Sequence, residues 1–384
     1  MKYLTILGAT GSIGGSAADI LLRHADAFSA YALVGHRNHQ RMLELAHALR
    51  PRWVVMTDTD AAGQLKGRLP EGVQLEAGMD AAVAMATDSS VDMVLAAMVG
   101  SVGLPAALAA VRAGKRVGLA NKECLVTAGR IFMQTARECG AEVVPVDSEH
   151  AAVHQCLAGH DHASVSRIIL TASGGPFRDR DPATMHAITP EEAVAHPNWD
   201  MGAKISVDSA TMMNKALELI EARWLFDIHP NKLSAIIHPQ SIVHGMVEYI
   251  DGSIVAQLAE PDMRGPITYA MQTHPRLSSG ISMLELAVRG RLDFQAVDEV
   301  RFPAMRLVKG VLSGHDSLAI VLNAANEIAN QAFREKHIPF TDIVRIIERA
   351  LESSEDVSVD GLDDVWSRDR EARRLTETFI ANLT

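Results

Sequence analysis

Two hydrophobic patterns alternate over the first 146 residues of the chain. Short runs rich in β-branched and apolar residues, typical of buried strands, are separated by segments whose apolar residues recur every three or four positions, as in helices. The strand candidates are YLTIL, AYALV, WVVM, VDMVL, KRVGL and EVVPV. Because strands separated by helices of this length pair in parallel, the pattern predicts an α/β domain over residues 1–146 with a doubly wound sheet.

The pattern changes after residue 146. Four strand candidates, SRIILTAS, LSAIIHP, SIVHGMVEY and SIVAQLAE, accompany one amphipathic helix that is predicted from Ile205 to Phe226 and entered through a polar cap. The last two strands meet at Asp251 and Gly252, a pair that favours a hairpin turn. We therefore predict a central α+β domain over residues 147–272.

The rest of the chain divides into an irregular part and a helical part. Residues 262–302 carry no regular pattern, and residues 273–298 among them are predicted to form a connecting arm. Beyond them, apolar residues recur at helical spacing over 303–312, 318–335, 341–351 and 368–382. This tail predicts a C-terminal helical bundle domain over residues 299–384.

Composition and charge narrow the class of protein. A chain of 384 residues with 48% hydrophobic and 22% charged residues is typical of a globular protein of several domains. A net charge of -11 argues against sequence-independent nucleic-acid binding. The three cysteines lack C-x-x-C spacing, and neither a secretion signal nor an apolar run of membrane-spanning length is found. We expect a soluble cytoplasmic protein with no membrane partner.

A glycine turn follows the first strand. GATGSIG places Gly8, Gly11 and Gly14 between a strand and a helix, with the small residues Thr10 and Ser12 in between. Glycines there allow a tight turn and let a pyrophosphate approach the N–H groups of the helix N-terminus. A tight turn without a ligand is the alternative, because the spacing is G-x-x-G-x-x-G and not G-x-G-x-x-G.

The second strand ends in residues that favour a phosphorylated cofactor. An NAD-binding protein carries an acid here for the ribose hydroxyls, whereas this chain has Gly35, His36, Arg37 and Asn38. Arg37 can bind the extra phosphate of NADP in a bidentate manner and Asn38 can donate a hydrogen bond. We therefore predict NADPH, with a solvated loop arginine as the alternative.

Carboxylates follow the strand EVVPV. Asp147 and Glu149 lie two apart, at the carboxyl end of a parallel strand, where ligands bind in open α/β sheets. An N-cap and first turn of a helix explain the same residues equally well. If Glu218 joins them, the three oxygen donors require a hard divalent cation such as Mg²⁺ or Mn²⁺.

One turn of the helix after residue 205 carries an unusual polar trio. Asn214, Lys215 and Glu218 lie three and four apart and share a face, with Ser209 near the helix start. Glu218 can serve the metal while Asn214 and Lys215 offer donors to an anion. A surface ion pair between Lys215 and Glu218 is the alternative.

Other polar motifs lie at the predicted strand ends. TASGGPF contains Ser173 and can form an N–H-lined turn for phosphate, although a generic turn has the same composition. Lys122 follows another strand and can steady a developing oxyanion, and residues 196–206 can close over a ligand. His238 and His244 are predicted to be structural strand histidines.

Taken in order, these motifs resemble one family. GATGSIG, LANKE, PVDSEH, TASGGPF, HPNWDMG, KISVDSATMMNKALELIEARW, HPQSIVH, EPDMRGP and VLNAANEI are similar to those of 1-deoxy-D-xylulose 5-phosphate reductoisomerase, from about residue 3 into the helical tail. The resemblance implies a homodimeric enzyme with a Rossmann-type NADP-binding domain. Such an enzyme rearranges a phosphorylated ketose and reduces the product with NADPH and Mg²⁺, Mn²⁺ or Co²⁺, in non-mevalonate isoprenoid biosynthesis.

The resemblance also implies roles for individual residues. Catalytic residues would be Lys122, Asp147, Glu149, Glu218 and His196. Metal ligands would be Asp147, Glu149 and Glu218. Substrate would contact Ser148, Ser173, His196, Trp199, Ser209, Asn214, Lys215, Glu218 and His244. NADPH would contact Thr10, Gly11, Ser12, Ile13, Arg37, Asn38, Asn121, Glu123, Met201 and Met263.

Two other functions fit parts of the sequence. A simple NADP-dependent semialdehyde or sugar-phosphate dehydrogenase would use the glycine turn, with the acids acting only as caps and surface charges. Such an enzyme would stay active after chelation of metals. A regulatory protein that senses NADPH would bind the cofactor without oxidising it, and it leaves the acid-rich second domain unexplained.

Overall fold

A parallel sheet organises the first of the two units into which the chain divides. The computed structural model describes residues 1–195 and 202–383. Unit 1 comprises Met1–Cys124, Phe132–His154 and Asp262–Met283, and unit 2 comprises Leu125–Ile131, Gln155–Pro261 and Leu284–Thr384. The predicted boundaries at residues 146, 272 and 298 stay predictions, since residues 262–283 group with the N-terminal part.

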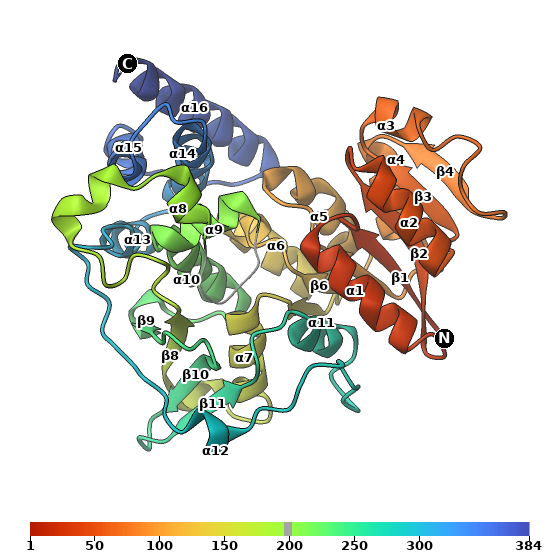
Figure 1. Cartoon of the computed structure of the whole chain (residues 1–384), viewed down its shortest axis with the longest axis horizontal. Coiled ribbons are helices and arrows are strands. Elements are labelled where there is room, and N and C mark those ends of the chain that lie inside the picture. The colour runs from red at the N-terminus through yellow and green to blue at the C-terminus, as the bar shows by residue number, and fades with distance from the viewer. Residues whose placement is uncertain (196–201, 384) are drawn as a thin grey trace. The chain divides into compact units, whose positions relative to one another are not determined.

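The sheet of unit 1 has the strand order β4-β3-β2-β1-β5-β6-β7, and every neighbouring pair is parallel (Figure 1). Its strands are β1 (Lys2–Leu7), β2 (Phe28–Gly35), β3 (Trp53–Met56), β4 (Gln74–Ala77), β5 (Met93–Ala96), β6 (Arg116–Leu119) and β7 (Val143–Pro145). The order reverses direction beside β1, as in a doubly wound sheet, which confirms the predicted fold class. Strand β4 was not expected from the sequence, because QLEA is a largely exposed edge strand without an apolar run.

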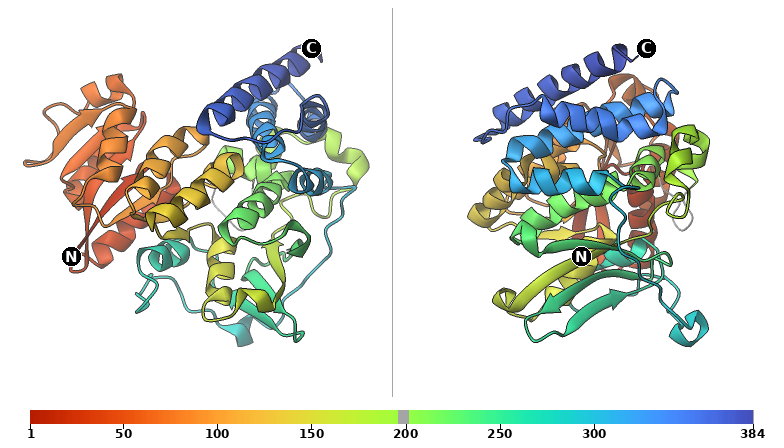
Figure 2. Two further views of the ribbon diagram at one scale, coloured as in Figure 1. Left: turned by 180° about the vertical axis from the view of Figure 1, so that it is seen from behind. Right: turned by 90° about the vertical axis from the view of Figure 1, so that its left-hand side faces the viewer.

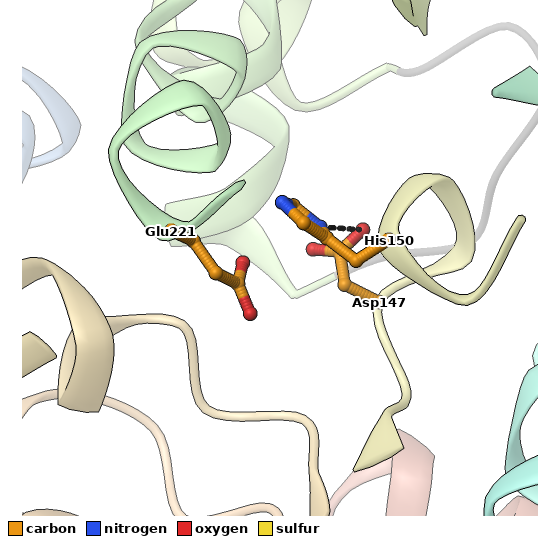
Figure 3. A group of neighbouring side chains, drawn as sticks. All are labelled: Asp147, His150 and Glu221. Carbon is orange, nitrogen blue, oxygen red and sulfur yellow. Dashed lines mark ion pairs between the residues drawn. The ribbon is translucent and has the colours of Figure 1, made fainter. Parts of the chain in front are cut away.

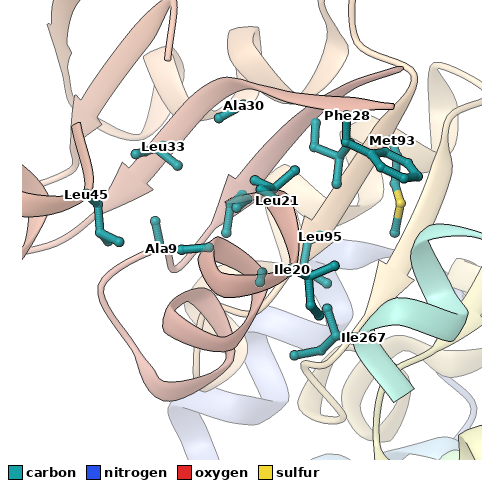
Figure 4. Packing of buried hydrophobic residues seen from close by; sticks show 14 of the residues in the cluster. Ala9, Ile20, Leu21, Phe28, Ala30, Leu33, Leu45, Met93, Leu95 and Ile267 are labelled. Atoms are coloured by element: carbon teal, nitrogen blue, oxygen red, sulfur yellow. The ribbon is translucent and has the colours of Figure 1, made fainter. Parts of the chain in front are cut away.

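Helices connect these strands and bury the sheet. They are α1 (Ser12–Arg23), α2 (His39–Leu49), α3 (Thr59–Gly63), α4 (Met79–Thr87), α5 (Leu104–Arg112), α6 (Glu123–Cys139) and α7 (Ser148–Leu157), with the short helix η1 (Ser101–Gly103) before α5. Ile20 of α1 and Leu95 of β5 belong to one buried cluster, and Ile267 of α11 (Arg264–Met271) joins it (Figure 4). Helix α11 lies in a segment that the sequence indicated to be irregular, and its apolar face is what attaches residues 262–283 to unit 1.

Unit 2 contains a mixed sheet of order β11-β10-β8-β9. Its strands are β8 (Val165–Ala172), β9 (Leu233–Ile237), β10 (Val243–Tyr249) and β11 (Ile254–Leu258). The short helix η2 (His162–Ser164) precedes β8, and η3 (Pro182–Ala187) and η4 (Pro230–Lys232) lie between β8 and β9. All four expected strands are present, and β10 pairs antiparallel with β11 across the predicted Asp251–Gly252 turn. Gly252 has a φ of +83°, the left-handed conformation that favours glycine in such a hairpin.

The helix predicted from Ile205 to Phe226 is wrong as a single element. The structure has α9 (Ala203–Ala210) and α10 (Met213–Leu225), separated by a corner at Thr211 and Met212. Met212 has a φ of +62°, and the hydroxyl of Thr211 accepts a hydrogen bond from Met213 N at 3.3 Å. Apolar periodicity continues through the corner, so the hydrophobic pattern alone does not reveal it.

The C-terminal part of unit 2 is helical, as predicted. Its helices are α13 (Ala304–Ser313), α14 (Asp316–Arg334), α15 (Phe340–Glu352) and α16 (Leu362–Ala381). Two short helices come earlier in the chain, α8 (Pro190–Val194) before α9 and α12 (Leu286–Arg289) after α11. Helix α14 packs against both α15 and α16 (Figure 2, blue). The rings of Phe333 and Phe340 meet edge to face with centroids 5.5 Å apart. Among the described helices, none has the combined length and apolarity that crossing a bilayer requires.

Candidate functional site

The glycine turn between β1 and α1 is shaped for close approach. Gly8 has a φ of +89°, and a Cβ atom there would lie 2.4 Å from the carbonyl oxygen of Ala97. A Cβ on Gly14 would lie 2.2 Å from the carbonyl oxygen of Ala9, so this glycine lets α1 pack directly on the turn. Gly11 caps α1 without a side-chain hydrogen bond. No side-chain cap therefore occupies the N–H groups at the start of α1, beside Thr10, Ser12 and Ile13.

Arg37 and Asn38 follow β2, as the sequence indicated. The guanidinium is largely exposed, and its Nε donates to Asp58 Oδ2 at 2.9 Å. Asp58 also caps α3, and hydrogen bonds from the Ala61 backbone and then from Arg37 lower the pKa of its carboxyl group. Asn38 Oδ1 accepts from Arg41 N at 3.1 Å and so caps α2. This ion pair with Asp58 uses Nε of Arg37 and not the two terminal nitrogens of the guanidinium.

Asn121 is held at the end of β6 with one polar atom unused. Its amide nitrogen donates to the carbonyl oxygen of Gly100 at 2.9 Å and to that of Met98. The residue is 3% exposed, and its Oδ1 has no hydrogen-bond partner among the described residues of the chain. A buried amide oxygen in this condition fits a ligand that brings its own donor. Glu123 begins α6 and is also buried.

The VDSEH motif spans the end of β7 and the start of α7. Asp147 accepts a hydrogen bond from Lys122 Nζ through Oδ2, and its Oδ1 lies 3.6 Å from Nδ1 of His150 (Figure 3). The Ser148 hydroxyl donates to Glu149. Unit 1 thus gathers Lys122, Asp147 and the fully buried His150 in one cluster. The sequence reasoning missed His150, although its i, i+3 spacing from Asp147 placed it on the same side.

The polar trio of unit 2 is buried. Asn214 Nδ2 donates to Glu218 Oε1, and Lys215 Nζ donates to Glu218 Oε2. Lys215 and Glu218 are 3% and 1% exposed, which excludes a solvated surface ion pair. Glu221, one turn further along α10, is fully buried and was also missed by the sequence reasoning. Its i, i+3 spacing from Glu218 was the available signal.

The turn that follows Ser173 lies against the end of helix α9 at Ser209. The Ser173 hydroxyl accepts a hydrogen bond from Gly175 N at 3.1 Å. Gly175 has a φ of +65°, and a Cβ atom on it would lie 2.8 Å from the carbonyl oxygen of Ser209. The two glycines after Ser173 therefore allow the turn to lie directly against the end of α9.

The remaining predicted residues lie in different surroundings. His244 of β10 is buried, and the loss of solvent lowers its pKa to about 4, so the ring is neutral near pH 7. Met263 caps α11 and packs on the core of unit 1. His196, Trp199 and Met201 lie outside the described residues.

Comparison with known proteins identifies relatives over the full length of the chain. The model for 1-deoxy-D-xylulose 5-phosphate reductoisomerase matches residues 4–129. The models for the C-terminal domain of that enzyme match residues 143–226 and 258–375. The reductoisomerase of Cupriavidus pinatubonensis is 49% identical over 100% of this chain and 99% of its own length. That of Pseudomonas aeruginosa is 50% identical over 99% of this chain and 98% of its own.

Solved structures give the same match. A crystal structure of DOX-P reductoisomerase in complex with NADPH, fosmidomycin and magnesium has a TM-score of 0.94 at 39% identity, covering 100% of this chain and 99% of that one. The 1-deoxy-D-xylulose 5-phosphate reductoisomerase of Zymomonas mobilis in complex with NADPH has a TM-score of 0.91 at 43% identity, covering 99% of both chains.

Proposed function

Because the chain belongs to the 1-deoxy-D-xylulose 5-phosphate reductoisomerase family, we propose how its own residues carry out that family's reaction. The protein is an NADPH-dependent oxidoreductase that uses a divalent cation. It rearranges the carbon skeleton of 1-deoxy-D-xylulose 5-phosphate and reduces the product to 2-C-methyl-D-erythritol 4-phosphate, a step of non-mevalonate isoprenoid biosynthesis. When bound, NADPH supplies a hydride and the cation supplies a Lewis acid.

The residues of unit 1 fit NADPH. The N–H groups at the start of α1 would hold the pyrophosphate beside Thr10–Ile13. Arg37 and Asn38 would hold the ribose phosphate, and the unused amide oxygen of Asn121 would accept a hydrogen bond from the cofactor. Glu123, Met201 and Met263 complete the proposed contacts.

The carboxylates fit a hard cation. We propose that Asp147, Glu149 and Glu218 hold the cation, because each offers a carboxylate oxygen and Mg²⁺ prefers oxygen ligands to imidazole nitrogen. Lys122 and Lys215 pair with Asp147 and Glu218 and hold these carboxylates in a fixed orientation.

The substrate would be held at its phosphate and at its reacting carbons by different residues. Ser173, Ser209, Asn214 and Lys215 supply hydroxyl, amide and ammonium donors for the phosphate. Lys122 would donate to an oxygen on which negative charge develops. Ser148, His196, Trp199 and His244 would complete the lining of the substrate site, with the neutral His244 ring adding no charge.

The observation that carries the site assignment is the burial of Lys215 and Glu218 on one face of α10. Taking two charges out of water is costly and is seldom kept for stability alone, because apolar residues of similar volume serve a core at least as well. A buried pair beside Asn214 is therefore better explained by ligand binding than by packing.

An assay of NADPH oxidation with 1-deoxy-D-xylulose 5-phosphate tests the activity directly. We expect turnover with Mg²⁺ and loss of turnover after treatment with EDTA, restored by adding Mg²⁺, because the carboxylates alone supply no Lewis acid. Activity that survives EDTA would favour a simple NADP-dependent dehydrogenase instead.

The variant Glu218→Gln tests the metal assignment. Removal of one anionic ligand should lower kcat by about 100-fold or more, while the dissociation constant of NADPH stays unchanged. Steady-state kinetics and fluorescence titration with NADPH measure the two effects. Glu348→Gln, on α15, is the control and should match the unmodified protein. Full activity of Glu218→Gln would exclude this residue as a ligand.

We further propose that the protein is a cytoplasmic homodimer. The segment from Leu286 to Val300 in unit 2 exposes large apolar side chains, since Leu286, Val288 and Val300 are 57%, 82% and 83% exposed. A groove of about 900 Å³ lies beside β9 and α13 in the same unit. A second copy would cover such surfaces. The free thiols of Cys139 and Cys156 suit a reducing compartment.

A further inference from the structure

Helix α14 buries three asparagines on one face. Asn323, Asn326 and Asn330 follow one another at spacings of three and four, and each is 0% exposed. A helix in a core is normally apolar on its inner face, because a buried amide loses its hydrogen bonds to water. The amide oxygens of Asn323 and Asn326 have no hydrogen-bond partner in the part of the chain that the structure describes. Packing alone does not explain this face.

Two of these asparagines bind a single carboxylate. Asn326 Nδ2 and Asn330 Nδ2 donate to Asp208 Oδ1 at 3.0 Å and 2.7 Å, and Asn330 Nδ2 also lies 2.9 Å from the carbonyl oxygen of Lys204. Lys204 Nζ lies 3.2 Å from Asp208 Oδ2. Asp208 is 1% exposed. All these atoms belong to unit 2, so α14 holds α9 through charge-assisted hydrogen bonds in a buried environment.

Helix α9 depends on tertiary contacts for its position. It has 8 residues, and its N-cap Gly202 forms no side-chain cap hydrogen bond. A helix this short is not stable by itself, so tertiary contacts determine where it lies. Ser209 directly follows Asp208, and the left-handed Met212 then turns the chain into α10. The direction of Ser209 and the first turn of α10 thus depend on how Asp208 is held.

We propose that Asn326 and Asn330 are positioning residues for the substrate phosphate, acting through Asp208. This inference rests on the proposed function, in which Ser209, Asn214 and Lys215 hold that phosphate. The two amides hold α9 in place, and the position of α9 determines where the chain turns at Met212. That turn then orients Ser209 before it and Asn214 and Lys215 after it. The C-terminal helical region thereby takes part in substrate recognition without touching the substrate.

Steady-state kinetics of three variants test the proposal. Asn330→Ala removes two donors to α9, and Asp208→Asn keeps the shape of the acceptor while removing its charge. Each should raise the KM for 1-deoxy-D-xylulose 5-phosphate and the inhibition constant of inorganic phosphate by about tenfold, because each weakens a buried hydrogen bond to a charged group. The KM for NADPH should change by less than about twofold.

Asn323→Ala is the matched control, because Asn323 is buried on the same helix face and donates to Glu327 at 3.4 Å instead of to Asp208. It should leave both KM values unchanged, although its melting temperature falls. The proposal would be wrong if the KM for substrate were unchanged in Asn330→Ala and Asp208→Asn. It would also be wrong if Asn323→Ala raised this KM equally, because the asparagines would then serve only the stability of the fold. If Asn330→Ala does not fold, Asp208→Asn decides the question. Failure of the unmodified protein to oxidise NADPH with this substrate would instead refute the proposed function.

Discussion

Burial changes what single charged residues can do in this protein. At i, i+3 spacing on a helix, Lys215 and Glu218 would contribute a few tenths of a kcal/mol on a surface. In the structure both residues are buried. Burial raises the free-energy cost of an unpaired charge and strengthens the attraction of a charged side chain for an ionic ligand. The chemistry of the pair therefore follows from its environment and not from its spacing.

His244 provides a test at the same scale. Burial lowers its pKa from the ordinary 6.5 to about 4, so the unfolded chain binds a proton between these values while the folded chain does not. The free energy of unfolding should therefore fall as the pH drops from 6.5 towards 4, by at most about 1.4 kcal/mol per pH unit.

Thermal unfolding of His244→Gln between about pH 7 and about pH 5 checks this expectation. The variant should lose less stability on acidification than the unmodified protein. His162→Gln, at an exposed position, serves as the control. Parallel pH curves for the unmodified protein and His244→Gln would show that His244 does not contribute to acid sensitivity.

At the scale of elements, the close approach of a turn to a helix end organises the candidate phosphate site. Gly175 has a φ of +65° and leaves no room for a Cβ beside Ser209. Gly140 has a φ of +66° and open space around it. Alanine at either position should cost about 1 kcal/mol of stability for its left-handed backbone.

Only Gly175→Ala should affect substrate binding. Its methyl group would push the Ser173 turn away from α9 and raise the KM for 1-deoxy-D-xylulose 5-phosphate by about tenfold. Kinetics of both alanine variants measure the difference. Equal KM values in the two variants would mean that the close approach of the Gly175 turn to α9 is not needed for binding.

The elements themselves were predicted unevenly from the sequence. The strands of both sheets except β4, and the helices α13 and α14, lie within one or two residues of their hydrophobic patterns, because those patterns mark buried faces. Helix α16 begins at Leu362, ahead of the predicted Arg368, since its first turns carry Asp363 and Asp364 at a helix N-terminus and not an apolar stripe.

At the scale of the whole molecule, the exposed apolar segment from Leu286 to Val300 is the surface at which we propose that a second copy binds. Val288→Asp should convert a dimer into a monomer, because a buried carboxylate at the interface would lose its solvent. Light scattering measures the molar mass. Leu22→Asp, on the exposed side of α1, is the control and should leave the mass unchanged. A monomeric unmodified protein would contradict the proposed homodimer.

The sequence by itself determined the α/β class, the glycine turn, the absence of an acid after β2 and the identity of the acidic and phosphate-binding candidates. These depend on local pattern and residue type. Only the tertiary structure decided that Lys215 and Glu218 are buried, that α9 and α10 are separate helices, and that Asn326 and Asn330 meet Asp208 across more than a hundred residues of chain. Burial and long-range hydrogen bonds arise from packing between distant segments, which no local window of sequence contains.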